Sequence, residues 1–113
     1  MDFNEYQKLA LETAIYPNLG SNIVYPALGL AGEAGELAEK VKKSWRNNDE
    51  MSGMKASSTL REGMIKESGD VMWYLAAIAS ELGVSLEAIA QINIEKLQDR
   101  RARNVIKSEG DNR

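Results

Sequence analysis

Apolar side chains recur every three to four residues along four stretches of the chain, which is the spacing of an amphipathic α-helix. Alternating runs of β-branched residues, which would indicate strands, are absent. Breaks in the helical pattern fall at Pro17, in a polar segment at 47–58, and at Gly83. The pattern therefore predicts an all-α protein with four helices, which run from about Phe3 to Ile15, from Tyr25 or Pro26 to Trp45, from Thr59 to Leu82 and from Leu86 to Arg101.

Residues with capping chemistry support these boundaries. Asp2-x-x-Glu5 has the form of a capping box at the start of the first helix, and Ser85 suits the N-cap of the last helix. Gly83 suits the left-handed residue that ends many helices. Because the connections are short, we expect an antiparallel four-helix, bundle-like fold or a fragment of a larger oligomeric bundle.

The length of 113 residues allows one compact domain and is too short for two. We expect that domain at 1–103, followed by a disordered tail at 104–113 that has little to bury. The hydrophobic share of 43% and the charged share of 27% are ordinary for a soluble globular protein. A lone domain of this size is only moderately stabilised by its core, and self-association would bury further apolar surface.

The net charge is −3, from 14 basic and 17 acidic residues, which gives no electrostatic reason to expect nucleic acid or a membrane as a partner. No apolar run approaches the ~18–20 residues that cross a bilayer. The N-terminal segment lacks the layout of a secretory signal, so a cytoplasmic location is expected.

Cysteine and histidine are both absent. Their absence excludes disulfides, cysteine or histidine zinc sites and serine–histidine catalysis. Any catalysis must therefore use carboxylates, Lys, Arg, Tyr or a metal held by oxygen, and such sites select Mg²⁺, Mn²⁺ or Ca²⁺.

Two segments with the same pattern carry paired acids. Each reads Glu, small residue, Gly, acid, aliphatic residue, with Glu33 and Glu36 in the second helix and Glu67 and Asp70 in the third. The spacing of i and i+3 places both acids of a pair on one helix face. On a helical wheel Glu33 and Glu67 lie at the margins of the apolar arcs, so packing of these arcs would bring them together. Glu36 and Asp70 would then lie one step further out.

Converging carboxylates either take up protons or bind cations. A divalent cation would resolve the repulsion and supply a bound water for hydrolysis of a phosphate ester or anhydride. A single Glu-x-x-Glu pair is more often a solvated helix face. Four glycines inside the helices, each costing about 1 kcal/mol relative to alanine, favour close backbone approach near the acids, for a site or for packing alone. These are Gly29, Gly32, Gly35 and Gly69.

The stretches Gly29–Lys40 and Glu67–Leu75 resemble the MazG-like, all-α nucleoside triphosphate pyrophosphohydrolase superfamily. The family pattern is Glu-Glu-x-x-Glu, followed after a spacer by Glu-x-x-Asp. Here Gly32 stands in place of the first glutamate. Further similarity at the start of the chain and in the last helix extends the resemblance over roughly Asp2 to Arg101.

The resemblance implies hydrolysis of a (deoxy)nucleoside triphosphate between its α- and β-phosphates, giving a monophosphate and pyrophosphate, as nucleotide-pool housekeeping. It implies Mg²⁺, with Mn²⁺ as a substitute, held by Glu33, Glu36, Glu67 and Asp70. One of these acids, or a water that they orient, would be the base. The resemblance also implies a MazG-type fold that assembles as a homodimer or homotetramer.

Other residues are weighed as substrate contacts. Asn93, Lys96 and Arg100 suit a nucleotide, and they equally suit a solvated basic face. Tyr74 either stacks on a base or packs at a subunit interface.

Three further side chains have structural expectations. Lys40 is expected to pair with Glu36 at i+4. Trp73 is expected at an interface because it points away from the apolar arc of its helix, whereas Trp45 is expected in the core.

Two classes of function stay open. The leading hypothesis is a Mg²⁺-dependent pyrophosphohydrolase of nucleoside triphosphates, with a phosphoribosyl-ATP or dUTP/dCTP pyrophosphohydrolase as the nearest alternative. The other class is a non-catalytic helical oligomer whose acids and glycines serve packing or regulation. Divalent cations separate the classes, because only a clustered carboxylate site is stabilised by millimolar Mg²⁺ or Mn²⁺.

Overall fold

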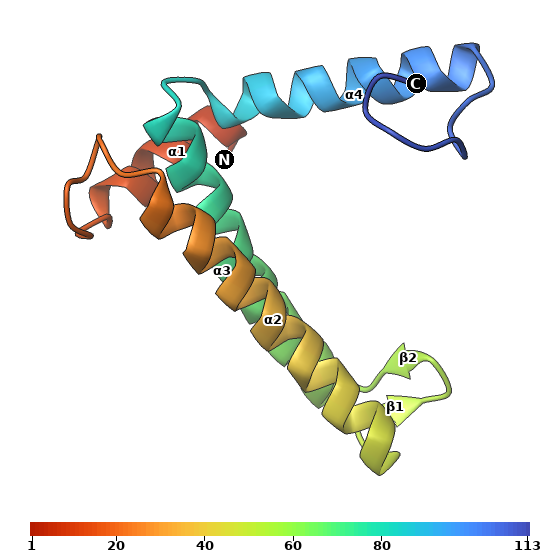
Figure 1. Ribbon diagram of the computed structural model, residues 1–113. Coiled ribbons are helices and arrows are strands. Elements are labelled where there is room, and N and C mark those ends of the chain that lie inside the picture. The colour runs from red at the N-terminus through yellow and green to blue at the C-terminus, as the bar shows by residue number, and fades with distance from the viewer.

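The computed structural model describes residues 1–113 and consists of four helices and one small hairpin (Figure 1). The all-α prediction is confirmed, and each helix boundary agrees with the sequence pattern to within three residues. The helices are α1 (Phe3–Glu12), α2 (Val24–Asn47), α3 (Ser58–Glu81) and α4 (Leu86–Ala102), and the strands are β1 (Met51–Ser52) and β2 (Lys55–Ala56).

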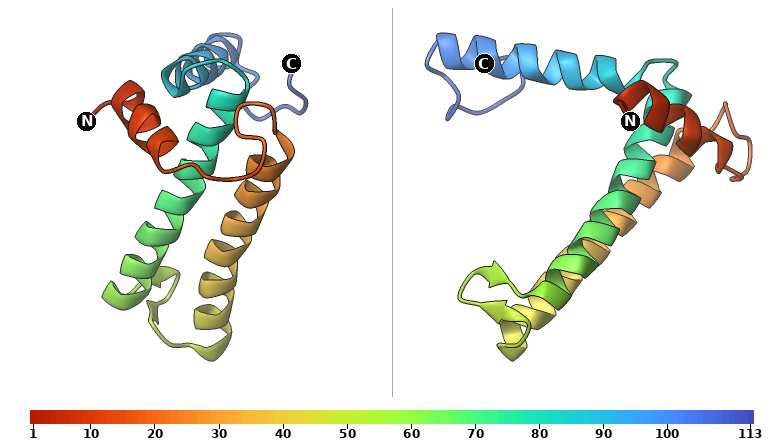
Figure 2. Two further views of the ribbon diagram at one scale, coloured as in Figure 1. Left: turned by 90° about the vertical axis from the view of Figure 1, so that its left-hand side faces the viewer. Right: turned by 180° about the vertical axis from the view of Figure 1, so that it is seen from behind.

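The segment between α2 and α3, predicted as a polar connection, contains this antiparallel hairpin. Met51 pairs with Ala56 and Ser52 pairs with Lys55, around Gly53 with its φ of +62°. The hairpin reverses the chain, so that α2 and α3, each 24 residues long, lie side by side and antiparallel (Figures 1 and 2).

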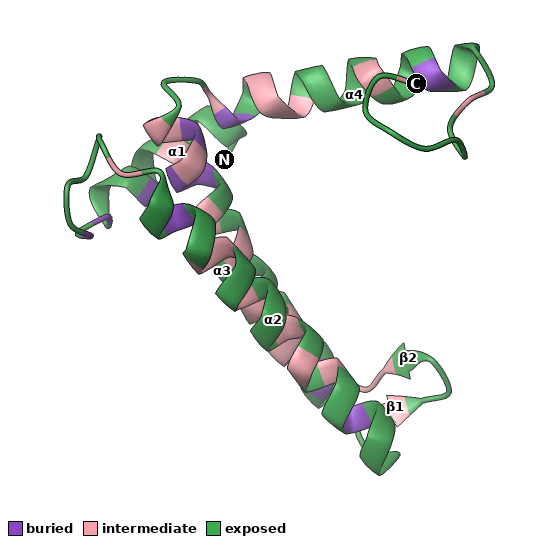
Figure 3. Ribbon diagram, viewed as in Figure 1, coloured by how far each residue is buried: buried purple, intermediate pink, exposed green.

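The most buried packing lies where α1 meets the C-terminal half of α3 (Figure 3). Ala76 and Ala79 of α3 are 1% and 0% exposed, and they form a hydrophobic cluster with Ala10 of α1 and Leu86 of α4. Their small side chains let the helix backbones approach closely. This junction holds α1 and the start of α4 on α3.

Trp73 completes the junction. Its ring packs against the clusters that α1 and α3 share, and its Nε1 donates a 2.8 Å hydrogen bond to Oγ1 of Thr13. The prediction that Trp73 faces outward is therefore wrong. The reason is that α3 packs against α1 as well as α2, so its buried arc is wider than one neighbouring helix would require.

Glu81 ties the connection between α1 and α2 to the end of α3. Its carboxylate accepts hydrogen bonds from the Tyr16 hydroxyl and from the backbone nitrogens of Gly20 (2.9 Å) and Asn22 (3.1 Å). The Tyr16 bond and the backbone bonds lower the pKa of Glu81, while burial and Glu81 raise the pKa of Tyr16 to about 12. A charged carboxylate thus anchors the loop that leads into α2.

The last helix leaves the rest of the chain at a sharp angle. Gly83 has a φ of +69°, and the Ser85 side chain caps α4 by accepting a hydrogen bond from the backbone nitrogen of Ala88, both as predicted. The axes of α3 and α4 are bent by 99°, so α4 projects away from the α2–α3 pair (Figure 2). One chain therefore does not close its four helices into a bundle. Residues 104–113 turn back along α4 (Figure 1).

The membrane-spanning potential of the helices is low. No helix by itself combines the length and apolar composition needed to cross a bilayer, and only α3 and α4 taken together across their bend reach that threshold.

A single chain leaves much apolar surface in solvent. Only 11 of 113 residues are buried, and the radius of gyration is 17.0 Å, where a compact chain of this length has about 13 Å. The accessible area of 8247 Å² exceeds the ~6,200 Å² expected for a compact monomer of this mass. Trp45, predicted in the core, is 61% exposed, because α3 covers only part of the apolar arc of α2.

Candidate metal centre

Four acidic side chains lie near the middle of the α2–α3 pair, with Glu33 and Glu36 on α2 and Glu67 and Asp70 on α3. One carboxylate oxygen from each of Glu33, Glu67 and Asp70 lies within 4.8 Å of the other two. Glu36 is exposed and lies outside this set, although its charge raises the pKa of Glu33. The two helices thus bring three of the four predicted acids together, and we call Glu33, Glu67 and Asp70 the carboxylate cluster.

Repulsion acts within the carboxylate cluster. Burial raises the pKa of Glu33 above its ordinary value of 4.5, and the charges of Glu36, Asp70 and Glu67 raise it further. Glu33 and Glu67 are half-buried in the seam between the helices, whereas Asp70 is exposed. A proton or a cation would relieve this repulsion.

One lysine contacts the cluster. Nζ of Lys40 on α2 lies 3.3 Å from Oε1 of Glu67 on α3. The expectation that Lys40 pairs with Glu36 is wrong, because the neighbouring helix presents Glu67 across the seam. A single ammonium group neutralises only part of the charge of three carboxylates.

The donor set of the cluster fits a hard divalent cation. Carboxylate oxygens are the ligands that Mg²⁺ and Mn²⁺ prefer. Opposite ligands of Mg²⁺, with bonds of about 2.1 Å, lie about 4.2 Å apart. The three carboxylate oxygens lie within 4.8 Å of one another, so small side-chain rotations would bring them onto one ion. Glu33, Glu67 and Asp70 would therefore hold such an ion, and Glu36 stands beside Glu33.

Tyrosine side chains lie beside the cluster. Burial raises the pKa of Tyr74, as do Tyr25, Glu33 and Asp70. Burial also raises the pKa of Tyr6 on α1, and the charge of Asp70 adds to this effect. The Tyr25 and Tyr74 rings have centroids 6.4 Å apart. Sequence reasoning singled out Tyr74 and missed Tyr6 and Tyr25, because neither belongs to a recognisable motif and their proximity depends on how the helices pack.

The glycines of the acid segments have different surroundings. A Cβ atom at Gly29 would overlap the Tyr74 ring, so this glycine permits the close approach that the sequence predicted. At Gly32, Gly35 and Gly69 a Cβ atom would meet nothing within 4 Å. Within one chain, close packing therefore explains only the first of these four glycines.

The three predicted substrate contacts on α4 are not brought to the carboxylate cluster within one chain. Lys96 lies 3.7 Å from Oδ1 of Asp111 in the tail. Arg100 is 3% exposed and donates hydrogen bonds to the backbone oxygens of Gly110 and Asp111. Asn93 borders an apolar cavity of about 340 Å³ between α3 and α4.

The domain model that describes the MazG nucleotide pyrophosphohydrolase domain matches residues 26–105, which is most of the chain. The chain belongs to this family. The matched residues include both acid pairs and all of α4, so the geometry described above is that of a MazG domain. The family resemblance predicted from the sequence is thereby confirmed.

The chain is also similar to the "Gene 37 protein" of Mycobacterium phage L5. The two are 43% identical over 118 aligned positions, which cover the whole of both proteins. The name of the phage protein states no activity. No solved structure matches the chain.

Millimolar Mg²⁺ or Mn²⁺ is expected to raise the melting temperature of this MazG domain at pH 7.5. A cation at ten times its Kd adds about 1.4 kcal/mol to the free energy of unfolding, which corresponds to several degrees for a domain of this size. The effect should shrink as the pH falls toward the raised pKa of Glu33, because protons then compete for the same oxygens. Differential scanning fluorimetry across pH 5–8 measures both trends.

A matched pair of variants assigns this response to the cluster. Glu33→Gln should abolish the shift caused by the cation. Glu12→Gln, which neutralises an exposed acid of α1 that forms no ion pair, should retain it. Equal shifts in the two variants would contradict a site at the cluster.

Proposed function

We propose that this MazG domain is a Mg²⁺-dependent hydrolase that cleaves (deoxy)nucleoside triphosphates between the α- and β-phosphates. The products are a nucleoside monophosphate and pyrophosphate. The observation that carries the proposal is the approach of Glu33, Glu67 and Asp70 within 4.8 Å of one another in the family's matched segment. With Glu36 beside them, these acids can hold the cation and orient water.

Apart from the cation, the reaction needs only water and the carboxylates of the chain. A water oxygen forms a bond to phosphorus, and the bond from the bridging oxygen to that phosphorus breaks with its electron pair on the departing phosphate. The proton of the water passes to one of the four carboxylates and then to solvent. A bound divalent cation supplies charge neutralisation for the phosphate oxygens and acidifies its water.

The positions of Asn93, Lys96 and Arg100 require a second copy of the chain if they contact the nucleotide. Because α4 projects away from its own cluster, a neighbouring copy would have to bring these residues to it. The ~2,000 Å² of accessible area beyond that of a compact monomer is comparable to what one chain buries in an obligate dimer. We therefore propose a homodimer or homotetramer, with Tyr74 beside the nucleotide.

Light scattering on the purified chain is expected to give the mass of two or four copies. The reason is that apolar side chains of α2 and α4 are exposed in one chain and would be buried by a second. A mass of 12.5 kDa at micromolar concentration would contradict the proposed assembly.

The proposed role is nucleotide-pool housekeeping in the cytoplasm, with nucleoside triphosphates as partners and neither nucleic acid nor a membrane involved. The tyrosines near the cluster offer stacking surfaces without dictating a base. A panel of ribo- and deoxynucleoside triphosphates, dUTP, dCTP and phosphoribosyl-ATP therefore resolves the substrate.

Turnover of at least one member of this panel to a monophosphate and pyrophosphate is expected with Mg²⁺. Asp70→Asn should lower kcat about 100-fold or more, because it weakens a cation ligand, while circular dichroism stays unchanged. Glu12→Gln, at an exposed acid of α1 that forms no ion pair, is the control and should keep its rate. Release of orthophosphate, or full activity in Asp70→Asn, would contradict the proposal.

A further inference from the structure

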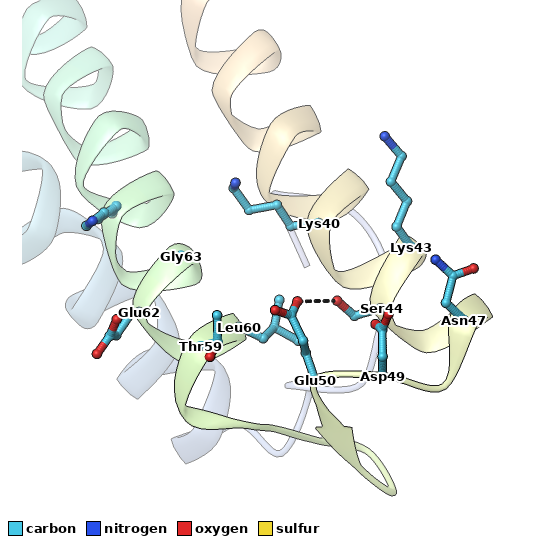
Figure 4. A pocket seen from close by; sticks show the side chains of 11 residues that line it. Lys40, Lys43, Ser44, Asn47, Asp49, Glu50, Thr59, Leu60, Glu62 and Gly63 are labelled. Atoms are coloured by element: carbon cyan, nitrogen blue, oxygen red, sulfur yellow. Dashed lines mark hydrogen bonds between the residues drawn. The ribbon is translucent and has the colours of Figure 1, made fainter.

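A cavity of about 580 Å³ opens between the hairpin-proximal ends of α2 and α3 (Figure 4). Eleven residues line it, of which only Leu60 is hydrophobic. Three of the lining residues are lysines, namely Lys40, Lys43 and Lys66. The carboxylates of Asp49, Glu50 and Glu62 line it as well, so the lining is polar with balanced charges and suits a charged ligand better than an apolar group.

The cavity and the carboxylate cluster share one side chain. Lys40 lines the cavity, and its Nζ reaches Glu67 of the cluster at 3.3 Å. On the facing helix, Gly63 lies one turn before Glu67, and a Cβ atom there would stand 3.6 Å from Cδ of Lys40. The cavity therefore begins where the cluster ends, and the Lys40 stem passes beside Gly63 between them.

The charges within the cavity are arranged unevenly. Lys43 is already paired with Glu39 at 3.4 Å, whereas Lys66 forms no ion pair. The acids at the opposite end are partly engaged, since Oγ of Ser44 donates a 3.3 Å hydrogen bond to Glu50. In Figure 4 the Glu62 carboxylate points away from Lys40. Lys66 is thus free to contact an anion, and Lys40 becomes available to one when its ammonium group leaves Glu67.

We propose that this cavity binds the pyrophosphate portion of the nucleotide, and that Lys40 contacts Glu67 in the free chain but a phosphate in the complex. The inference rests on the proposed function. A cation on the cluster neutralises Glu67 and so weakens its attraction for Lys40. The Lys40 side chain is 46% exposed and has a flexible four-carbon stem, which allows its ammonium group to turn into the cavity.

Two opposite effects distinguish this exchange from a purely structural ion pair. If Lys40 competes with the cation for Glu67, its removal should strengthen cation binding in the absence of phosphate. If Lys40 also binds phosphate, the same removal should weaken binding of pyrophosphate once the cation is present. A lysine that only positions Glu67 would weaken cation binding when removed.

Isothermal titration calorimetry with Mn²⁺ alone, and with inorganic pyrophosphate in the presence of Mg²⁺, measures both effects. Lys40→Met is expected to bind Mn²⁺ about two- to fivefold more tightly and pyrophosphate about five- to tenfold more weakly than the unaltered chain. Lys40→Arg keeps the charge and should stay within about twofold of the unaltered chain. Lys42→Met is the matched control, because Lys42 pairs with Glu39 outside this cavity, and it should change neither affinity.

Lys66→Met gives an independent test that leaves the Glu67 ion pair intact. It should weaken pyrophosphate about two- to fivefold without changing Mn²⁺ binding. Pyrophosphate affinities equal to that of the unaltered chain in Lys40→Met and Lys66→Met, with Mn²⁺ still bound, would overturn the subsite and leave the proposed function standing. Weaker Mn²⁺ binding in Lys40→Met would also overturn it. Absence of Mn²⁺ binding by the unaltered chain would instead overturn the proposed function itself.

Discussion

Mutual repulsion among three carboxylates in the seam between α2 and α3 is the constraint on which the proposed chemistry of this MazG domain depends. Glu33, Glu67 and Asp70 come from two antiparallel helices that pack side by side along their length (Figure 1). The packing therefore forces the acids together, and burial and like charges raise the pKa of Glu33 as a consequence. Only Lys40 offsets this charge within the chain. A divalent cation bound by the same carboxylates would relieve this repulsion, which favours its binding.

The remainder of the fold holds this seam in place and leaves other faces open. The alanine-rich junction of α1 with α3, reinforced by Trp73, and the Glu81 anchor fix the end of the helix pair farthest from the hairpin. The 99° bend before α4 then carries Lys96 and Arg100 away from their own cluster. The proposed assembly with further copies would account for both the exposed apolar surface and this separation.

Much of this architecture could be predicted from local sequence. Helix periodicity, the Ser85 cap and the left-handed Gly83 are local signals. The positions of Glu33 and Glu67 at the margins of the apolar arcs already predicted that they meet at one seam. Features that depend on two or more helices could not be predicted in this way. Lys40 pairs with Glu67 across the seam, and α1 covers Trp73. Trp45 stayed exposed because a helical wheel identifies an apolar arc and not what covers it.

The most direct measurement is anomalous diffraction from crystals of the chain grown with Mn²⁺. A cation held by the seam predicts an anomalous peak within about 2.5 Å of carboxylate oxygens of Glu33, Glu67 and Asp70 in every copy. The peak should be lost in Glu67→Gln crystals. Crystals that contain millimolar Mn²⁺ but show no peak at the cluster, with the three side chains pointing apart, would contradict the central claim.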